Sequence, residues 1–511
     1  MCKLSMSSTD ELDISAIFLL ILCDTEMLLM CEILNAVKFK KGFALLPGLA
    51  IIVGWLALFG YYNLAEATVD ENAPSMNLYA YEVLRGQVLQ SPLPPLVAAP
   101  EPIKAVDCDY YLYNAMIIDG TGAPAYVANI AIKGDTIIDI GAFPAGEGAK
   151  IINMTGLTVT PGFIDIHTHT EDHWLLKGVT GAAALLQGVT THITGNCGTS
   201  PSDISGYLSS LDNPPINVGI YMGYKALRRM FVSDDKPVTA EILAKMEQQL
   251  DAAIKNGALG LSAGLDYWPQ TKATKAELIA LAKVVAANDA LFALHIRGEY
   301  NTLIASVQEM IDITRESGVR MQYAHVKAGG SSNWGKQETV LQMLNAAIAE
   351  GLDIRGDVYA YTYSSLDIGT SNNPISEANI VKVMQNPYVM IGSDGGLHGT
   401  TGTSIHPRVY GNNARVIAKY VRTDGILTLE EAIKKMTSMP AERFHFTDRG
   451  QIAIGYKADI AAFNFDEVQD KATRNATNII SEGFKYVFVN GVLSVSEGKL
   501  TGNHGGTALT Q

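Results

Sequence analysis

Hydrophobic and polar positions follow two different patterns along this chain. From 109 to 152 and again from 459 to 495, short alternating runs separated by Gly-rich turns predict β-strands. The middle, 161–449, instead alternates apolar runs with stretches of helical periodicity at 239–255, 275–288, 301–317 and 336–350. Its predicted strands are 158–166, 189–194, 216–221, 258–262, 291–296, 319–325, 352–358 and 388–393. Eight strands with intervening helices predict an α/β fold, a parallel (β/α)8 TIM-like barrel.

The two β-rich segments, 108–160 and 450–511, lie on either side of the predicted barrel. Because the barrel sequence separates them, we expect both chain ends to build one small β-sandwich domain. The pair Asn490-Gly491, between two apolar runs, predicts a tight hairpin turn in the second segment.

The first hundred residues differ from the rest. Lys38, Lys40 and Lys41 precede an apolar run at 43–61, and Ala65-Glu66-Ala67 follows. This order is typical of a secretory signal peptide, although an uncleaved membrane anchor and a buried core helix are the alternatives. We therefore predict a leader at 1–67, in which 1–36 precede the true translation start, and a linker at 68–107. The protein is expected to be exported to the cell envelope or periplasm rather than cytoplasmic, with membrane contact only through this leader.

Length, charge and cysteine usage narrow the classes of function. The chain has 511 residues, more than one ordinary domain needs, and a net charge of −14. That charge argues against nucleic acid as a partner, because phosphates require a basic surface. Outside the leader the cysteines are Cys108 and Cys197, which either pair as a disulfide or serve other chemistry.

Metal-ligand residue types gather where the predicted strands end. His167 and His169 follow the first strand and, since strand side chains alternate, point to the same side. Cys197 follows strand two, and the later strands add His295, His325 and Asp394. Any one of these residues alone could be a solvated polar strand end. Because the carboxyl ends of barrel strands form one rim, the set together predicts a metal site.

Several motifs give the chain a family resemblance. They are Asp119-Gly120-Thr121-Gly122, GFIDIHTH at 162–169, GVTTHITGNCG at 188–198, HIRGE at 295–299, His325-Val326-Lys327, SDGG at 393–396 and His406-Pro407-Arg408. With these motifs the chain resembles the amidohydrolase superfamily and, more closely, the D-aminoacylase (N-acyl-D-amino-acid deacylase) family, from about 109 to 506. GFIDIHTH marks only the superfamily, whereas GNCG together with HIRGE and HPR is more specific.

The resemblance implies a small-molecule substrate and a zinc-dependent hydrolysis of N-acyl-D-amino acids to a carboxylate and a D-amino acid. It implies a tight zinc on Cys197, His295 and His325, and a second, weaker or vacant position at His167, His169 and Asp394. Asp394 would also be the catalytic acid/base. The residues implied to hold the substrate are Lys327, Tyr359, Ser365 and Arg408. The segment 364–388 is shorter than in many family members, which predicts a more open pocket.

Other functions remain open at this stage. A cyclic-amide hydrolase of the hydantoinase or dihydroorotase type is the nearest rival, but strand four, at 258–263, lacks the lysine that bridges two metals in those enzymes. An acyl-dipeptide or N-acyl-D-glutamate amidohydrolase is compatible with the same residues. So is a membrane-tethered binding protein that kept the barrel and lost catalysis.

Overall fold

The computed structural model of the chain describes residues 104–171, 180–368, 370–396 and 406–510. The predicted leader and nearly all of the predicted linker therefore lie outside the described residues. Among the helices that are described, none has the length and apolar character needed to cross a membrane.

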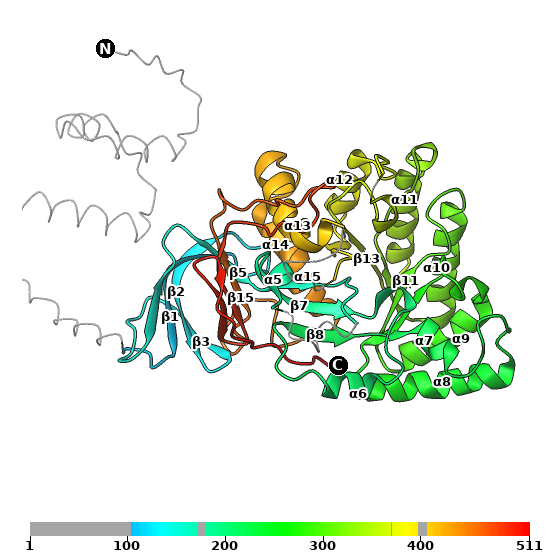
Figure 1. Ribbon diagram of the computed structural model, residues 1–511, viewed down its shortest axis with the longest axis horizontal. Coiled ribbons are helices and arrows are strands. Elements are labelled where there is room, and N and C mark those ends of the chain that lie inside the picture. The colour runs from blue at the N-terminus through cyan, green and yellow to red at the C-terminus, as the bar shows by residue number, and fades with distance from the viewer. Residues whose placement is uncertain (1–103, 172–179, 369, 397–405, 511) are drawn as a thin grey trace, which may run out of the picture. The chain divides into compact units, whose positions relative to one another are not determined.

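Strands from both chain ends join in one nine-stranded sheet (Figure 1). Along the sheet the order is β18-β17-β16-β15-β5-β1-β2-β3, and β4 pairs with the first half of β1 while β5 pairs with its second half. The sheet therefore branches at β1, and strands from both ends surround a common apolar core. The strands are β1 (Tyr110–Ile117), β2 (Tyr126–Lys133), β3 (Thr136–Gly141), β4 (Lys150–Asn153), β5 (Thr158–Pro161), β15 (Ile460–Phe463), β16 (Phe484–Val489), β17 (Val492–Ser496) and β18 (Lys499–Leu500).

The middle of the chain forms the predicted parallel barrel. Two parallel sheets contribute its strands, in the orders β6-β7-β8 and β14-β13-β12-β11-β10-β9. Strand three is split into β8 and β9 at Tyr221, whose amide donates to Thr194 O. The ring closes where Thr168 and Gly395 form a parallel bridge beyond β6 and β14. The strands are β6 (Phe163–Asp165), β7 (Val189–Thr194), β8 (Asn217–Ile220), β9 (Met222–Gly223), β10 (Gly260–Gly264), β11 (Leu291–His295), β12 (Arg320–Tyr323), β13 (Ile354–Val358) and β14 (Val389–Ile391).

The predicted single strand at 158–166 is wrong, because the chain changes sheets at Gly162. β5 pairs with β1 and β15 in the end-built sheet, whereas β6 pairs with β7 in the barrel. A Cβ atom on Gly162 would lie 2.3 Å from the side chain of Thr190, so only glycine fits this close approach. The change of sheet joins the two parts of the fold directly before the first metal-type histidines.

Helices cover the outside of the barrel at the places the periodicity predicts. Thr239 and Thr274 cap the amino ends of α8 and α9, each accepting a hydrogen bond from a backbone amide three residues later. The helices are α5 (Ala182–Leu185), α6 (Ile204–Ser209), α7 (Tyr224–Arg229), α8 (Ala240–Lys255), α9 (Lys275–Ala287), α10 (Leu303–Ser317), α11 (Lys336–Ala349), α12 (Glu377–Gln385), α13 (Arg408–Arg415), the π-helical Val416–Thr423, α14 (Leu429–Met436) and α15 (Ser438–Arg443).

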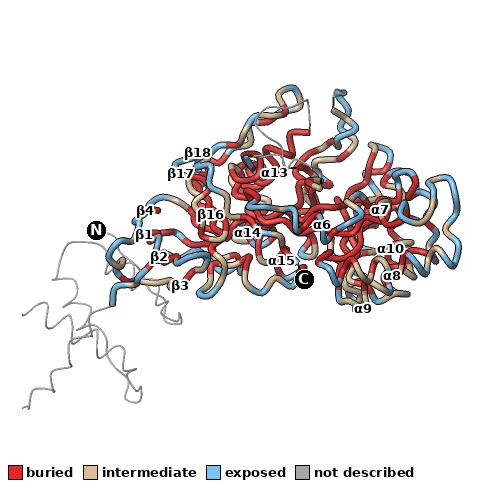
Figure 2. The backbone as a smooth tube through the Cα atoms, turned by 60° about the horizontal axis from the view of Figure 1, so that its bottom comes forward, coloured by how far each residue is buried: buried red, intermediate tan, exposed pale blue. Residues whose placement is uncertain are grey.

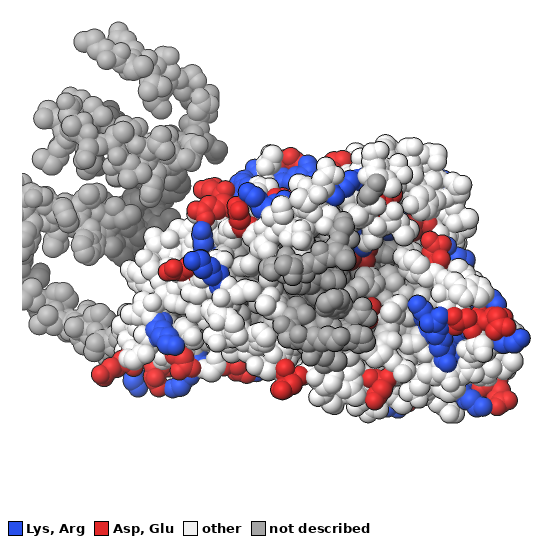
Figure 3. Space-filling view, viewed as in Figure 1, with Lys and Arg blue, Asp and Glu red and all other residues white. Residues whose placement is uncertain are grey.

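Burial follows this layering. Figure 2 shows buried residues gathered in the interior, while α8 and α9 carry intermediate and exposed ones on the outside. On the face drawn in Figure 3, acidic and basic side chains lie next to one another. Exposed pairs on the outer helices include Lys275 with Asp312 at 2.9 Å and Arg315 with Glu350 at 2.7 Å. Such exposed pairs contribute little stability, so the buried core holds the barrel together.

Candidate metal centre

A tight turn after β7 places Cys197 at the mouth of the barrel. Gly195 and Cys197 both have left-handed backbone conformations, with φ of 77° and 51°. Ser262 of β10 holds the turn, because its hydroxyl donates to Gly195 O and accepts from the Gly198 amide at 3.0 Å. Cys197 is buried, with 7% of its surface exposed.

Three imidazole nitrogens surround the sulfur of Cys197. Sγ lies 3.6 Å from Nε2 of His167, 3.8 Å from Nδ1 of His295 and 3.9 Å from Nε2 of His325. Tetrahedral zinc with bonds of about 2.3 Å to sulfur and about 2.0 Å to nitrogen would hold those atoms about 3.5 Å apart. The donor set and its spacing therefore fit zinc. Cys108 is a separate free cysteine, so the alternative Cys108–Cys197 disulfide is absent from the described residues.

Asp394 brings a carboxylate to the same cluster. Its Oδ1 lies 3.0 Å from Nε2 of His169 and 3.6 Å from Nε2 of His167. His167 thus lies between the sulfur of Cys197 and the carboxylate of Asp394, and it belongs to two of the three potential ligand groups, one with Cys197 and His325 and one with His169 and Asp394. The sequence prediction placed His167 only with the second group.

The electrostatics of the cluster favour a cation. Burial raises the pKa of the Cys197 thiol, but the four surrounding histidines hold it well below its usual range, so the sulfur is a thiolate. Burial lowers the pKa of His167, yet the carboxylates of Asp357 and Asp394 raise it to about 10. The cluster therefore stabilises positive charge at His167, where a metal ion would replace the proton.

Arg408 links Asp394 to the substrate-binding residues implied by the sequence. Its Nη2 lies 2.9 Å from Oδ2 of Asp394 and donates to Ser365 Oγ at 2.9 Å, and the guanidinium lies 4.7 Å from the ring centroid of Tyr359. Its Nε and Nη1, and the hydroxyl of Tyr359, are buried without a partner among the described residues. Buried donors of this kind are costly unless a ligand or water satisfies them.

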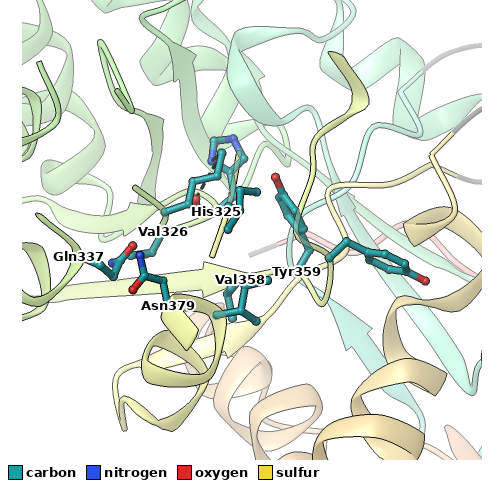
Figure 4. A pocket seen from close by; sticks show the side chains of 10 residues that line it. His325, Val326, Gln337, Val358, Tyr359 and Asn379 are labelled. Carbon is teal, nitrogen blue, oxygen red and sulfur yellow. Dashed lines mark hydrogen bonds between the residues drawn. The ribbon is translucent and has the colours of Figure 1, made fainter. Parts of the chain in front are cut away.

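Lys327 has a different arrangement from Arg408. Its ammonium donates to Glu299 Oε1 at 2.6 Å, and the same oxygen lies 2.9 Å from Nδ1 of His325. His325, Lys327 and Tyr359 line one small cavity at the ends of β12 and β13. Figure 4 shows this cavity with His325 and Tyr359 labelled. A carboxylate of the protein therefore already occupies one side of Lys327.

Comparison with known proteins identifies the family. The sequence profile described as the Amidohydrolase family matches residues 158–493, from the end of the first β-segment through the barrel and into the last strands. The chain belongs to the amidohydrolase family.

Relatives of this amidohydrolase share most of its length. It is 32% identical to N-acyl-D-glutamate deacylase and 30% identical to D-aminoacylase, both of Alcaligenes xylosoxydans xylosoxydans. The first match covers 75% of this chain and 93% of the relative, and the second covers 79% and 98%. The predicted family resemblance is confirmed.

Solved structures give the same result. N-acyl-D-glutamate deacylase from Bordetella bronchiseptica, in a complex with zinc and a phosphonate that mimics the tetrahedral intermediate, is 30% identical, with a TM-score of 0.73 over 80% of this chain and all of that one. A D-aminoacylase structure that concerns a binuclear metal centre is 28% identical with the same TM-score, over 79% of this chain and all of that one. The predicted barrel fold is confirmed.

Two carboxylates behind the ligands of this amidohydrolase escaped the sequence reasoning. Asp357 of β13 lies 3.0 Å from Nδ1 of His167 and accepts from the backbone amide of His325 at 2.8 Å. Glu299 Oε1 lies 2.9 Å from Nδ1 of His325, and Nζ of Lys327 lies 2.8 Å from the same nitrogen. In both histidines Nδ1 therefore faces a carboxylate, and Nε2 faces the cluster. Glu299 stood within HIRGE and was a findable signal, whereas Asp357 looks like any buried acid within a strand.

His406 has a structural role that the amino-acid sequence did not indicate. Its Nδ1 accepts from the Arg408 amide at 3.0 Å, and its Nε2 lies 2.9 Å from Tyr363 O. Burial and the neighbouring Arg408 lower the pKa of His406 to about 2, so the ring is neutral. The neutral ring of His406 donates to Tyr363 O and accepts from the Arg408 amide. These two contacts orient the amino end of α13, whose first residue is Arg408.

Proposed function

We propose that this amidohydrolase hydrolyses the amide bond of N-acyl-D-amino acids with zinc at the Cys197 cluster. One observation carries the proposal: Asp394 contacts the metal-ligand histidines through Oδ1 and the partly unpaired guanidinium of Arg408 through Oδ2. The reacting centre and a carboxylate-binding group are thus joined by a single side chain. Relatives with deacylase activity named for N-acyl-D-amino acids support the same substrate class.

The metal assignment follows the donor chemistry. Cys197, His295 and His325 would hold the tight zinc, and His167, His169 and Asp394 a second, weaker one. Zinc bound there would supply a Lewis acid that polarises the amide carbonyl and activates water. Glu299 and Asp357 contact Nδ1 of His325 and of His167 on the outer side of the cluster and so orient Nε2 toward the metal position.

Asp394 is the acid/base in this proposal. Burial raises its pKa, but Arg408 and the neighbouring histidines hold the pKa well below its usual range, so the carboxylate is ionised. It accepts a proton from the attacking water through Oδ1 and returns that proton to the nitrogen of the departing D-amino acid. Without the returned proton the leaving group would be an amide anion.

Arg408 binds the substrate carboxylate. Its Nε and Nη1 are buried donors without a partner among the described residues, and each can donate to an oxygen of a carboxylate. The hydroxyl of Tyr359 adds a third donor, Ser365 steadies Nη2, and Lys327 adds positive charge behind the ring of Tyr359, 5.7 Å from its centroid. The preference for the D configuration rests on the relatives.

The cyclic-amide alternative lacks support at strand four. β10 (Gly260–Gly264) contains no lysine, and its Ser262 is committed to the Cys197 turn. Hydantoinase structures share the fold at 16% identity and a TM-score of 0.60, which supports the fold alone.

The direct test assays the purified zinc-loaded protein on matched N-acetyl-D- and N-acetyl-L-amino acids and on hydantoin and dihydrouracil. We expect release of free D-amino acid, with little turnover of the L series. Faster turnover of L substrates would overturn the D assignment, and turnover confined to the cyclic amides would overturn the proposed reaction.

A further inference from the structure

A cavity of about 440 Å³ opens directly beside the metal cluster. The described residues that line it include His169 after strand one, Cys197 after strand two, Lys225 after strand three, and Tyr267 and Trp268 after strand four. That volume is within the range of ordinary small-molecule sites. The cavity is therefore a second part of the substrate site, adjacent to the cluster at which the amide would react.

Lys225 is the feature of this cavity that the catalytic scheme does not use. Among the described residues it forms no hydrogen bond or ion pair, and none of the described lining residues is a carboxylate. The basic residues that follow it on α7 are committed: Arg228 donates to Ser233 O at 3.0 Å, and Arg229 pairs with Asp234. Lys225 lines this cavity and also a neighbouring one with Thr199, Ser200 and Arg229, and its ammonium forms no ion pair with a carboxylate among the described residues.

The barrel separates Lys225 from the proposed carboxylate-binding group. Arg408 contacts Ser365 and Tyr359, which follow strand seven, whereas Lys225 follows strand three. In an eight-stranded barrel these two strands stand on opposite sides of the axis. A substrate held by its α-carboxylate at Arg408 and by its amide at the metal cluster therefore extends its acyl group or its side chain toward Lys225.

The walls of the cavity suit a short acidic chain. Tyr267 and Trp268 are 42% and 56% exposed and provide flat apolar surface for methylene groups. The ammonium of Lys225 then meets the group at the end of that chain. A terminal carboxylate satisfies it by charge, whereas an amide of the same shape does not.

We infer, on the basis of the proposed function, that Lys225 is a specificity-determining residue that selects substrates with a second carboxylate. This carboxylate belongs either to an acidic D side chain or to a dicarboxylic acyl group, and both present the same chemistry to the ammonium. Neutral N-acyl-D-amino acids enter the same cavity without this contact.

Two isosteric substrate pairs distinguish the sources of the second carboxylate. N-acetyl-D-glutamate against N-acetyl-D-glutamine tests the side chain, and N-succinyl-D-leucine against N-succinamoyl-D-leucine tests the acyl group. The wild type, Lys225→Met and Lys225→Arg are compared at low ionic strength. Lys272→Met is the matched control, because Lys272 lies 4.7 Å from the ring centroid of Trp268 but donates to Asp235 O, and it does not line the cavity.

We expect the wild type to prefer the charged member of at least one pair by about two- to fivefold in kcat/KM, as one ion pair in a partly open site would give. Lys225→Met should remove that preference by raising KM with kcat unchanged, Lys225→Arg should keep it, and Lys272→Met should behave as the wild type. The pair that responds identifies which end of the substrate occupies the cavity.

Other outcomes overturn the inference in distinguishable ways. Equal wild-type rates on the charged and neutral members of both pairs, or an equal loss on both members in Lys225→Met, would remove Lys225 from specificity and leave the proposed function intact. If the zinc-loaded wild type turned over neither the four substrates nor N-acetyl-D-leucine, both the proposed function and this inference would be overturned.

Discussion

Glu299 offers the sharpest separation between stability and metal binding. It is 6% exposed, and its Oε1 accepts from Lys327 at 2.6 Å and lies 2.9 Å from Nδ1 of His325. Glu299→Gln keeps the shape of the side chain but removes its charge. The buried ammonium of Lys327 then lacks its counterion, and His325 lacks its carboxylate partner.

The substitution should lower both the free energy of unfolding and the zinc affinity, and a second substitution should restore only the first of these. Removing one partner of a buried ion pair costs about 3–5 kcal/mol of unfolding free energy. Removing the carboxylate behind a metal-ligating histidine weakens metal binding about 10–100-fold. Adding Lys327→Met to Glu299→Gln removes the unpaired ammonium, so most of the stability should return, whereas the zinc affinity should remain low.

Denaturant unfolding and chelator competition measure the two effects separately. Glu309→Gln is the control, because Glu309 pairs with Arg297 at 2.9 Å outside the cluster and should change neither quantity by much. If Glu299→Gln matched the wild type in both stability and zinc affinity, the paired role of Glu299 would be refuted. If Lys327→Met also restored zinc affinity, Glu299 would act through Lys327 rather than through His325.

Four further predictions address the cluster and the leader. Cys197→Ala should lose bound zinc and activity together, and full zinc occupancy by metal analysis would show that the thiolate is no ligand. Asp394→Asn should keep the fold and the tight zinc while kcat falls about 10²–10⁴-fold, and a rate within a few-fold of the wild type would remove Asp394 from the chemistry. Arg408→Lys should raise KM for N-acyl-D-amino acids and blunt discrimination against their amides; unchanged kinetics on both would exclude Arg408 as the group that binds the carboxylate. Mass spectrometry of the native protein should find an amino terminus near Thr68, and peptides from 1–36 would refute the expected start near Val37.

Much of the barrel was accessible from sequence because its strands are apolar runs separated by capped helices. The helical periodicity predicted α8 and α9 to within one residue at each end, and the motifs at the strand ends predicted which residues meet at the mouth. The break at Gly162 was not accessible, because 158–166 reads as one strand whichever sheet it joins. The cause is a long-range contact with Thr190, which no local pattern records.

The site shows the same division. Cys197 and the histidines were readable from residue type and position, but their grouping was not: His167 lies between two potential ligand groups only because β6 and β14 close the ring beside it. Nothing in the sequence distinguishes Asp357 from an ordinary buried residue of a strand. Lys327 donates to Glu299, which follows the neighbouring strand, and no local pattern in the sequence indicates that contact.

The central claim is that zinc at the Cys197 cluster drives hydrolysis of N-acyl-D-amino acids. Titrating zinc into chelator-stripped protein, while bound metal and release of D-amino acid are both measured, tests it most directly. We predict no turnover without metal and full recovery with the first tightly bound equivalent. Full turnover by the stripped protein, or stoichiometric zinc without any release of D-amino acid, would contradict the account.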